Sequence, residues 1–416
     1  MKHFIITLAL VAALVGGVAT TSQADTVLTG NTFGGAFFKI VVPTNWNGDL
    51  VVWNHGFSLS PIGPVSDLGP LSALQLSEGY AVAASSYTQI GWALFRTPID
   101  LLNMILVFKA NFGSPNNILM NGASLGGIVT DQAVELINFG KIKGSFPFCG
   151  ANAGSINWNG AIDLRLIYDY VCSNTPAAAI PGGATGLPSP GFPSYPFTST
   201  QLGLAVHACT GVLAPPAFRT PQQTANLSQI LALTQLPENF LLIDMGFVTF
   251  GLSNLIFDPT KLAGTQGVGN ANVNYDNGGP VDTNIQRVSA NFLSSLWLKL
   301  NFTPSGNVGN TKIVSLHTDK DGLVIVENEN YYASKVSSSK LTTAIAVEST
   351  PTHCGFTSGE VAAGWESLRG WVAGGPQPTA ATIQGTCQFI TGGAPGQCRI
   401  DPSFVIPPIT NRIRPR

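Results

Sequence analysis

At residues 121–127 the chain reads Asn121-Gly122-Ala123-Ser124-Leu125-Gly126-Gly127, and this stretch decides the fold. A short apolar run, Ile118 to Met120, precedes it, and a run with helical character, Ile128 to Phe139, follows it. A serine at the tip of a strand-to-helix turn takes a strained backbone conformation, and its neighbours must be small because the helix folds back on the strand. The pattern Gly-x-Ser-x-Gly in this setting predicts a nucleophile elbow, with Ser124 as the attacking residue.

Short apolar runs alternate with helical patterns on both sides of this elbow. We expect buried strands at 50–53, 80–84, 144–149, 312–316 and 341–347, with helices at 71–78, 99–112 and 360–373. Strands that alternate with helices form a mostly parallel sheet covered by helices on both faces. The sequence therefore predicts an α/β fold whose core consists of residues 25–150 and 311–380.

The alternation stops between residues 151 and 310, where long apolar helical patterns and Pro/Gly/Ser-rich stretches take over. We interpret this segment as a lid or cap insertion over the edge of the sheet. Beyond the core, residues 381–416 hold Cys387 and Cys398 on either side of a glycine-rich run. That spacing predicts a C-terminal hairpin closed by a disulfide, followed by a tail.

Residues 1–24 have the features of a signal peptide, with an apolar run from Phe4 to Val18 and a small-x-small site ending at Ala24. The mature chain would then begin at Asp25 and be secreted or periplasmic. We expect no later segment to act as a transmembrane anchor. The net charge of −2 and a charged fraction of 10% give no basic patch, so nucleic acid is not an expected partner.

The order of motifs along the chain selects a base and an acid for Ser124. A serine nucleophile needs a histidine base that a third group orients, and in this architecture the order is serine, acid, histidine. His353 is the one histidine that follows the acidic loop after the 312–316 strand. Within that loop Asp321 is favoured over Asp319, because it lies where the chain turns into the next segment, and Glu327 is a third candidate.

Two backbone N–H groups are needed for the oxyanion that forms when the serine attacks. The residue after the nucleophile, Leu125, is the expected first donor. The second is expected in the loop after the 50–53 strand, at Phe57 of His55-Gly56-Phe57. The side chain of His55 is expected to brace this loop rather than to take part in chemistry.

These motifs together resemble the α/β-hydrolase fold superfamily, and the resemblance covers most of the mature chain apart from the insertion and the tail. A weaker likeness is to secreted tannase and feruloyl-esterase-type enzymes, which also carry a large lid between the same two strands. In those enzymes a disulfide links a cysteine just before the serine to one just after the histidine. Here Cys354 follows His353, but Ala123 precedes Ser124, so the resemblance makes Cys149 the candidate partner of Cys354.

The other four cysteines suggest two further bridges. An even number of cysteines in an exported chain favours disulfides, although the connectivity is not deducible from sequence. Cys387–Cys398 would close the C-terminal hairpin, and Cys172–Cys209 would staple the insertion. No Cys-x-x-Cys spacing points to zinc, and no cofactor is expected. Asp258, Asn270, Asn272 and Asp276 would suit either a calcium ion or an ordinary loop rich in Asn and Asp.

The motifs predict a secreted serine hydrolase that cleaves carboxylic esters through an acyl-enzyme on Ser124. A peptidase of the same fold acting on short peptides is the alternative, and a non-catalytic binding protein is a third reading. The apolar insertion, with Trp53, Phe57 and Trp92 on loops at the same sheet edge, favours neutral apolar or aromatic esters, either small molecules or polymers. Trp53 and Trp92 are the residues expected to bind this substrate.

Overall fold

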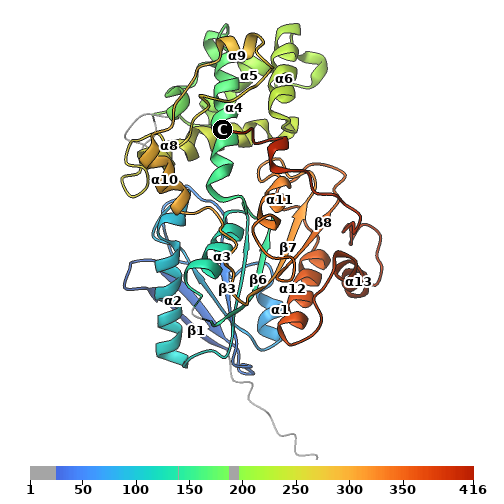
Figure 1. Ribbon diagram of the computed structural model, residues 1–416. Coiled ribbons are helices and arrows are strands. Elements are labelled where there is room, and N and C mark those ends of the chain that lie inside the picture. Colours follow the sequence, from blue (N-terminus) through green and yellow to red (C-terminus); the bar gives the residue numbers. More distant parts are fainter. Residues whose placement is uncertain (1–24, 139, 187–195) are drawn as a thin grey trace, which may run out of the picture.

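The computed structural model describes residues 25–138, 140–186 and 196–416, and Figure 1 shows the chain as a sheet domain topped by a layer of helices. The predicted signal peptide lies outside the described residues. Eight strands form one sheet in the order β1-β2-β4-β3-β5-β6-β7-β8. The strands are β1 Thr26–Asn31, β2 Phe37–Val42, β3 Leu50–Asn54, β4 Ala81–Ser85, β5 Ile118–Ala123, β6 Ile142–Phe148, β7 Lys312–Thr318 and β8 Leu341–Ala346. Only the pairings of β2 are antiparallel, so the predicted mostly parallel sheet is confirmed.

Alternate residues of each central strand enter two separate cores, because successive side chains of a strand point to opposite faces. Val52 belongs to the core that includes residues of α2 Thr97–Phe112, α3 Leu125–Leu136 and α11 Glu327–Ala333. Trp53, its neighbour in β3, packs on the other face with α1 Ser72–Ser77 and α12 Ser358–Val372. The central strands are therefore buried on both faces, which is why they read as continuous apolar runs.

The segment between β6 and β7 forms the helical layer above the carboxyl ends of the strands (Figure 1). Its helices are α4 Asn157–Val171, α5 Ser199–Thr210, α6 Pro221–Thr234, α7 Leu241–Gly246, α8 Leu252–Phe257, α9 Pro280–Asn284 and α10 Phe292–Leu300. A π-helical turn, Phe247–Gly251, joins α7 and α8. Residues 285–291 separate α9 from α10.

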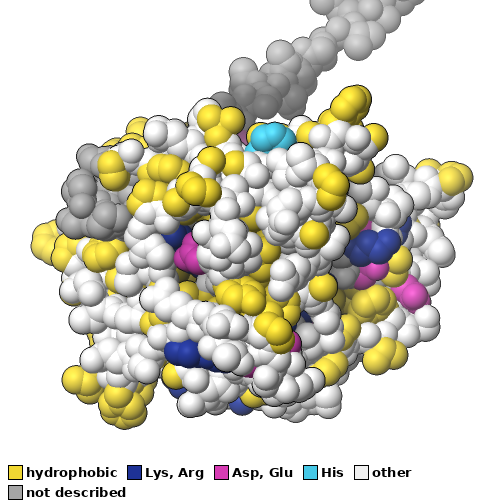
Figure 2. Space-filling model, turned by 90° about the horizontal axis from the view of Figure 1, so that it is seen from above, with side chains coloured by type: hydrophobic (Ala, Val, Ile, Leu, Met, Phe, Trp, Pro, Cys, Tyr) yellow, Lys and Arg dark blue, Asp and Glu magenta, His cyan; other side chains and the backbone are white. Residues whose placement is uncertain are grey.

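The stretch Glu238–Phe257 is long and apolar enough to cross a membrane, by length and composition alone. The sequence reading, which expected no later segment with these properties, missed it. About two thirds of its most apolar window, 67%, is buried inside the protein, and core helices meet the same criterion. Figure 2, which views the molecule from the side of this helical layer, shows a surface dominated by uncharged polar and hydrophobic groups.

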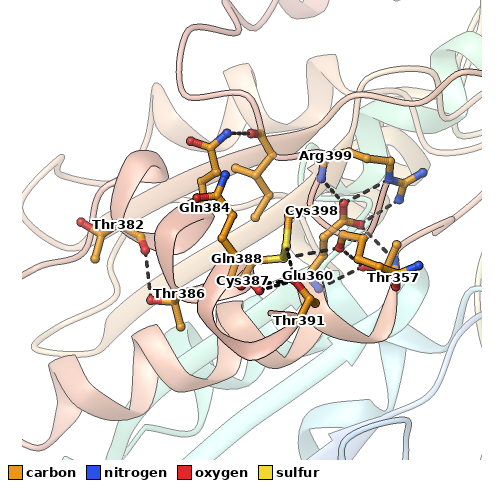
Figure 3. Close-up of a disulfide and its surroundings, with 12 residues drawn as sticks. Thr357, Glu360, Thr382, Gln384, Thr386, Cys387, Gln388, Thr391, Cys398 and Arg399 are labelled. Atoms are coloured by element: carbon orange, nitrogen blue, oxygen red, sulfur yellow. Dashed lines mark hydrogen bonds and ion pairs between the residues drawn. A yellow bond between two sulfur atoms is a disulfide. The ribbon is translucent and has the colours of Figure 1, made fainter. Parts of the chain in front are cut away.

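The predicted C-terminal hairpin is wrong, because residues Ala380–Ile390 form the helix α13. The side chain of Thr379 caps this helix by accepting a hydrogen bond from the N–H of Thr382. The disulfide Cys387–Cys398 then ties the helix to the chain that follows it, as Figure 3 shows. This arrangement places Arg399 beside the buried carboxylate of Glu360, with a shortest ion-pair distance of 2.8 Å.

All three expected disulfides are present: Cys149–Cys354, Cys172–Cys209 and Cys387–Cys398. The first joins the end of β6 to the loop that carries His353, across 205 residues of sequence. The second joins the end of α4 to α5 within the helical layer. The described chain therefore has no free cysteine.

Candidate active site

Ser124 stands at a sharp turn between β5 and α3, as the sequence predicts. Its φ of 58° and ψ of −124° give it a positive-φ backbone conformation, which residues other than glycine rarely adopt. A Cβ built on Gly126 would lie only 1.9 Å from the carbonyl oxygen of Asn54, and one on Gly122 would lie 2.2 Å from that of Gly126. Only glycine fits at these two positions, so the packing of α3 against β3 and β5 holds the strained serine in place.

His353 lies between Ser124 and Asp321 in hydrogen-bonding geometry. Its Nε2 is 2.9 Å from Ser124 Oγ, and its Nδ1 is 2.7 Å from Asp321 Oδ2. The Asp321 side chain is fully buried, whereas 24% of the His353 side chain is exposed. The structure thus brings together the three residues that the chain order selects.

The Asp321 carboxylate is fixed by backbone donors on both of its oxygens. Oδ1 accepts the N–H groups of Leu323 and Val324, each at 3.0 Å, and Oδ2 accepts the N–H of Cys354 at 3.2 Å. Asp319, the second candidate for the acid, instead accepts the N–H of Glu348 at 2.7 Å. Glu327, the third candidate, pairs with Arg412 at 3.1 Å. Asp321 alone of the three contacts His353.

Two anchors hold the loop that carries His353. The disulfide to Cys149 fixes Cys354, the next residue, to the end of β6 beside the elbow. Arg399 donates a hydrogen bond of 2.6 Å to the carbonyl of Gly355 and is itself held by Glu360. Both anchors connect the loop to the sheet domain, and Asn239 of the helical layer adds a hydrogen bond of 2.9 Å to the carbonyl of Pro351.

The loop His55-Gly56-Phe57 lies directly against the serine. A Cβ built on Gly56 would be 3.5 Å from Ser124 Cβ, so the backbone passes close to the Ser124 hydroxyl. His55 stacks on Tyr87 with ring centroids 4.1 Å apart, and its Nδ1 lies 2.8 Å from the Gly56 carbonyl oxygen. Burial lowers the pKa of His55, which favours the neutral ring. These contacts support the expected bracing role of His55.

A cavity of about 610 Å³ opens next to Ser124 and His353, between the sheet domain and the helical layer. Most of the residues that line it are apolar: Phe57, Leu59, Trp92, Leu164, Leu236, Ile243, Phe247, Val248, Phe250, Leu323, Val324, Ile325 and Ile413. Phe247 packs on Phe57 with centroids 4.8 Å apart and stacks on Trp158 at 4.9 Å. An apolar substrate group would therefore be surrounded by aromatic and aliphatic side chains.

The two tryptophans expected to bind substrate have different positions. Trp92 lines the cavity, and its ring packs edge-on against Trp158 at 5.6 Å. Trp53 belongs to β3 rather than to a loop, is 5% exposed, and stacks on Phe148 at 5.9 Å in the core on the opposite face. It lines a separate cavity of about 310 Å³, so its expected place next to Ser124 is wrong.

The sequence reasoning missed four ionisable residues that line the main cavity: Asp163, Asp244, Arg412 and Arg414. The two arginines belong to the last residues of the chain, which fold back over α11 and against the insertion. The sequence does mark the two arginines as unusual, since three arginines fall within residues 412–416 of a chain in which only 10% of residues are charged.

Three of the four residues considered as calcium ligands make other contacts. Asp258 pairs with Lys261 at 3.2 Å, and Asp276 accepts the N–H groups of Val281 and Asp282 at the start of α9. Asn270 is buried and donates to the Gln286 carbonyl at 2.9 Å. The loop reading accounts for these contacts.

The strand order, the turn at Ser124 and the sequence order of Ser124, Asp321 and His353 are those of the α/β-hydrolase fold. Solved structures that the chain resembles include an esterase from Aspergillus oryzae, at 11% identity and a TM-score of 0.45, with 85% of this chain and 80% of that chain covered. Feruloyl esterase B from Aspergillus oryzae matches at 13% identity and a TM-score of 0.43, covering 85% and 81%. Candida antarctica lipase A matches at 13% identity and a TM-score of 0.37, covering 94% and 83%. No protein-family model and no curated protein matches the sequence.

Proposed function

We propose that the chain is a carboxylic-ester hydrolase in which Ser124 is the nucleophile, His353 the general base and Asp321 the residue that orients the base. One observation carries the proposal: His353 bridges Ser124 Oγ and the buried Asp321 carboxylate with hydrogen bonds of 2.9 and 2.7 Å, at the wall of a mostly apolar cavity. A serine hydroxyl becomes nucleophilic when a positioned histidine takes its proton.

The reaction follows from these positions. Ser124 Oγ attacks the ester carbonyl carbon while His353 Nε2 removes the hydroxyl proton, and the N–H groups of Phe57 and Leu125 are assigned to the resulting oxyanion. The imidazolium then protonates the leaving alcohol, which gives an acyl-enzyme. Water, activated by the same imidazole, attacks the acyl group and releases the acid and the free serine.

The cavity favours neutral apolar or aromatic esters, since its wall near Ser124 is formed by side chains such as Phe57, Trp92 and Phe247. Small-molecule and polymeric esters both fit this proposal. The three disulfides suit an oxidising compartment, so we also propose that the protein acts after export, with residues 1–24 as the leader.

Kinetics on a panel of p-nitrophenyl esters and aminoacyl anilides test the proposal. Ser124→Ala and His353→Ala should each lose at least about a thousandfold in kcat/KM, because the three residues act as a unit. Asp321→Asn should also be severe, and Asp319→Asn, two residues away, is the matched control that should stay near wild type. Preference for anilides over every ester would favour the peptidase, and an active Ser124→Ala variant would refute the assignment of the nucleophile.

A further inference from the structure

Two of the four ionisable residues on the cavity wall are fully engaged within the protein. Asp163 accepts a hydrogen bond of 2.5 Å from the Tyr275 hydroxyl and pairs with Arg416 at 3.0 Å. Arg414 donates to the carbonyl of Leu233 and lies over the Tyr275 ring, 5.2 Å from its centroid. These groups hold the final residues of the chain against the insertion, and their role is structural.

Asp244 and Arg412 differ from that pair because each has a buried polar atom with neither a hydrogen bond nor an ion pair in the described chain. Asp244, on α7, is 7% exposed, and its Oδ2 makes no hydrogen bond to any residue in the described ranges. Arg412 uses Nε to hold Glu327 at 3.1 Å, while its Nη1 is buried and likewise unpartnered within the described chain. Both side chains line the cavity that contains Ser124.

Buried polar groups in native proteins are nearly always hydrogen-bonded, so an unpaired acid and an unpaired guanidinium on the wall of one cavity point to a ligand. We propose that Asp244 and Arg412 form a polar subsite that binds a neutral hydroxyl group of the ester substrate, away from the bond that is cleaved. This inference rests on the proposed esterase function and adds a second recognition point to an otherwise apolar cavity.

The chemistry of the two residues selects the hydroxyl. A guanidinium only donates hydrogen bonds, and the oxygens of a carboxyl group accept them whether or not the group is protonated, whereas a hydroxyl does both and can satisfy the two residues at once. Burial, together with the charge of Asp321, raises the pKa of Asp244 well above its usual range, so a cation would find little negative charge to pair with and would face Arg412. An anion would lie near the carboxylates of Asp321 and Glu327. A neutral hydroxyl group is repelled neither by the Arg412 guanidinium nor by the neighbouring carboxylates.

Matched esters test this subsite. We would measure kcat/KM for p-nitrophenyl alkanoates, ω-hydroxyalkanoates and ω-methoxyalkanoates over a series of chain lengths. At the chain length that reaches the subsite, the wild-type protein should prefer hydroxy over methoxy esters about tenfold, because only the hydroxyl donates to Asp244. A methoxy ester that equals or exceeds its hydroxy partner at every length would overturn the proposal without any variant.

Substitutions on the cavity wall test whether Asp244 causes the preference for hydroxy esters. Asp244→Leu should lower the ratio of hydroxy to alkyl ester kcat/KM about tenfold, because it removes one of the hydroxyl's partners. Thr234→Val is the matched control, since the Thr234 hydroxyl also lies at the cavity but already donates to the Ile230 carbonyl at 2.8 Å. If the ratio of hydroxy to alkyl ester kcat/KM falls equally in both variants, or falls in neither, the assignment of Asp244 to the subsite is contradicted.

A binding measurement separates this inference from the proposed function. On Ser124→Ala protein, calorimetry would compare 1,ω-diols with alcohols of the same length, and Asp244→Leu should weaken diol binding about tenfold more than alcohol binding. If no ester is cleaved but the diols show this loss, the esterase proposal fails and the subsite stands. If esters are cleaved and the diols show no extra loss, the subsite fails alone.

Discussion

Removal of the Cys149–Cys354 disulfide is expected to damage both stability and activity. In the chain-entropy model, closing a loop of 205 residues restricts the unfolded chain by about 5 kcal/mol. For the roughly 390 residues after the predicted leader, the unfolding entropy is on the order of 0.8 kcal/mol per degree, so the midpoint temperature should fall by about 6 °C in the double variant Cys149→Ser/Cys354→Ser. Calorimetry or circular dichroism at a fixed scan rate measures this fall.

The same double variant should lose at least tenfold in kcat/KM at 25 °C, well below its melting temperature. Cys354 is adjacent to His353 and donates its N–H to Asp321 at 3.2 Å, so freeing it loosens the base and the acid together. The control is Cys172→Ser/Cys209→Ser, which opens a bridge of 37 residues within the helical layer and costs about 4 kcal/mol in the same model. Equal losses of activity in the two double variants, or full activity in the first, would refute the positioning argument.

Three further substitutions test the stability and the packing around the site. Burial raises the pKa of Glu329 from 4.5 to about 7, so its contribution to stability is present below pH 4.5 and lost as the pH rises through 7. We therefore expect the free energy of unfolding of Glu329→Gln, relative to that of wild type, to be on the order of 2–3 kcal/mol higher at pH 8 than at pH 4.5. Urea unfolding at the two pH values measures this difference. Gly126→Ala should prevent folding, judged by soluble yield and circular dichroism, because its Cβ would meet the Asn54 carbonyl at 1.9 Å, and a well-folded variant would contradict the account of the elbow. Arg399→Met should lower kcat/KM several-fold with KM little changed, because the carbonyl of Gly355 near the catalytic base loses its donor, and an unchanged kcat would remove Arg399 from the positioning of that loop.

The sequence predicted the parts of the site that local patterns determine. The elbow follows from small residues at fixed offsets around Ser124, and the assignment of His353 follows from chain order among only five histidines. The choice of Asp321 over Asp319 rested on its place at the end of the loop, where the structure shows it accepting the N–H of Val324. Each of these inferences needed only a few neighbouring residues and the strand–helix alternation.

Other features depend on contacts between distant segments, which local patterns do not reveal. Trp53 ends the strand expected at 50–53, yet it was also counted among the loop residues that would bind substrate; in the structure it belongs to β3 and packs against Phe148. The hairpin prediction gave weight to the glycines of 392–396 and overlooked the helix cap at Thr379. The positions of Asp244 and Arg412 were not predictable, because an insertion and a chain end meet there only after folding.

The cavity wall is assembled from widely separated stretches of the chain, and residues 412–414 follow all the others in sequence. Ser124, α7 and His353 all precede them, and Arg412 forms the part of the wall that lies beside Glu327. Arg412 closes that side only when the final stretch docks between α11 and the insertion. A variant that lacks residues 412–414 would therefore keep Ser124, Asp321 and His353 but lose this part of the cavity wall.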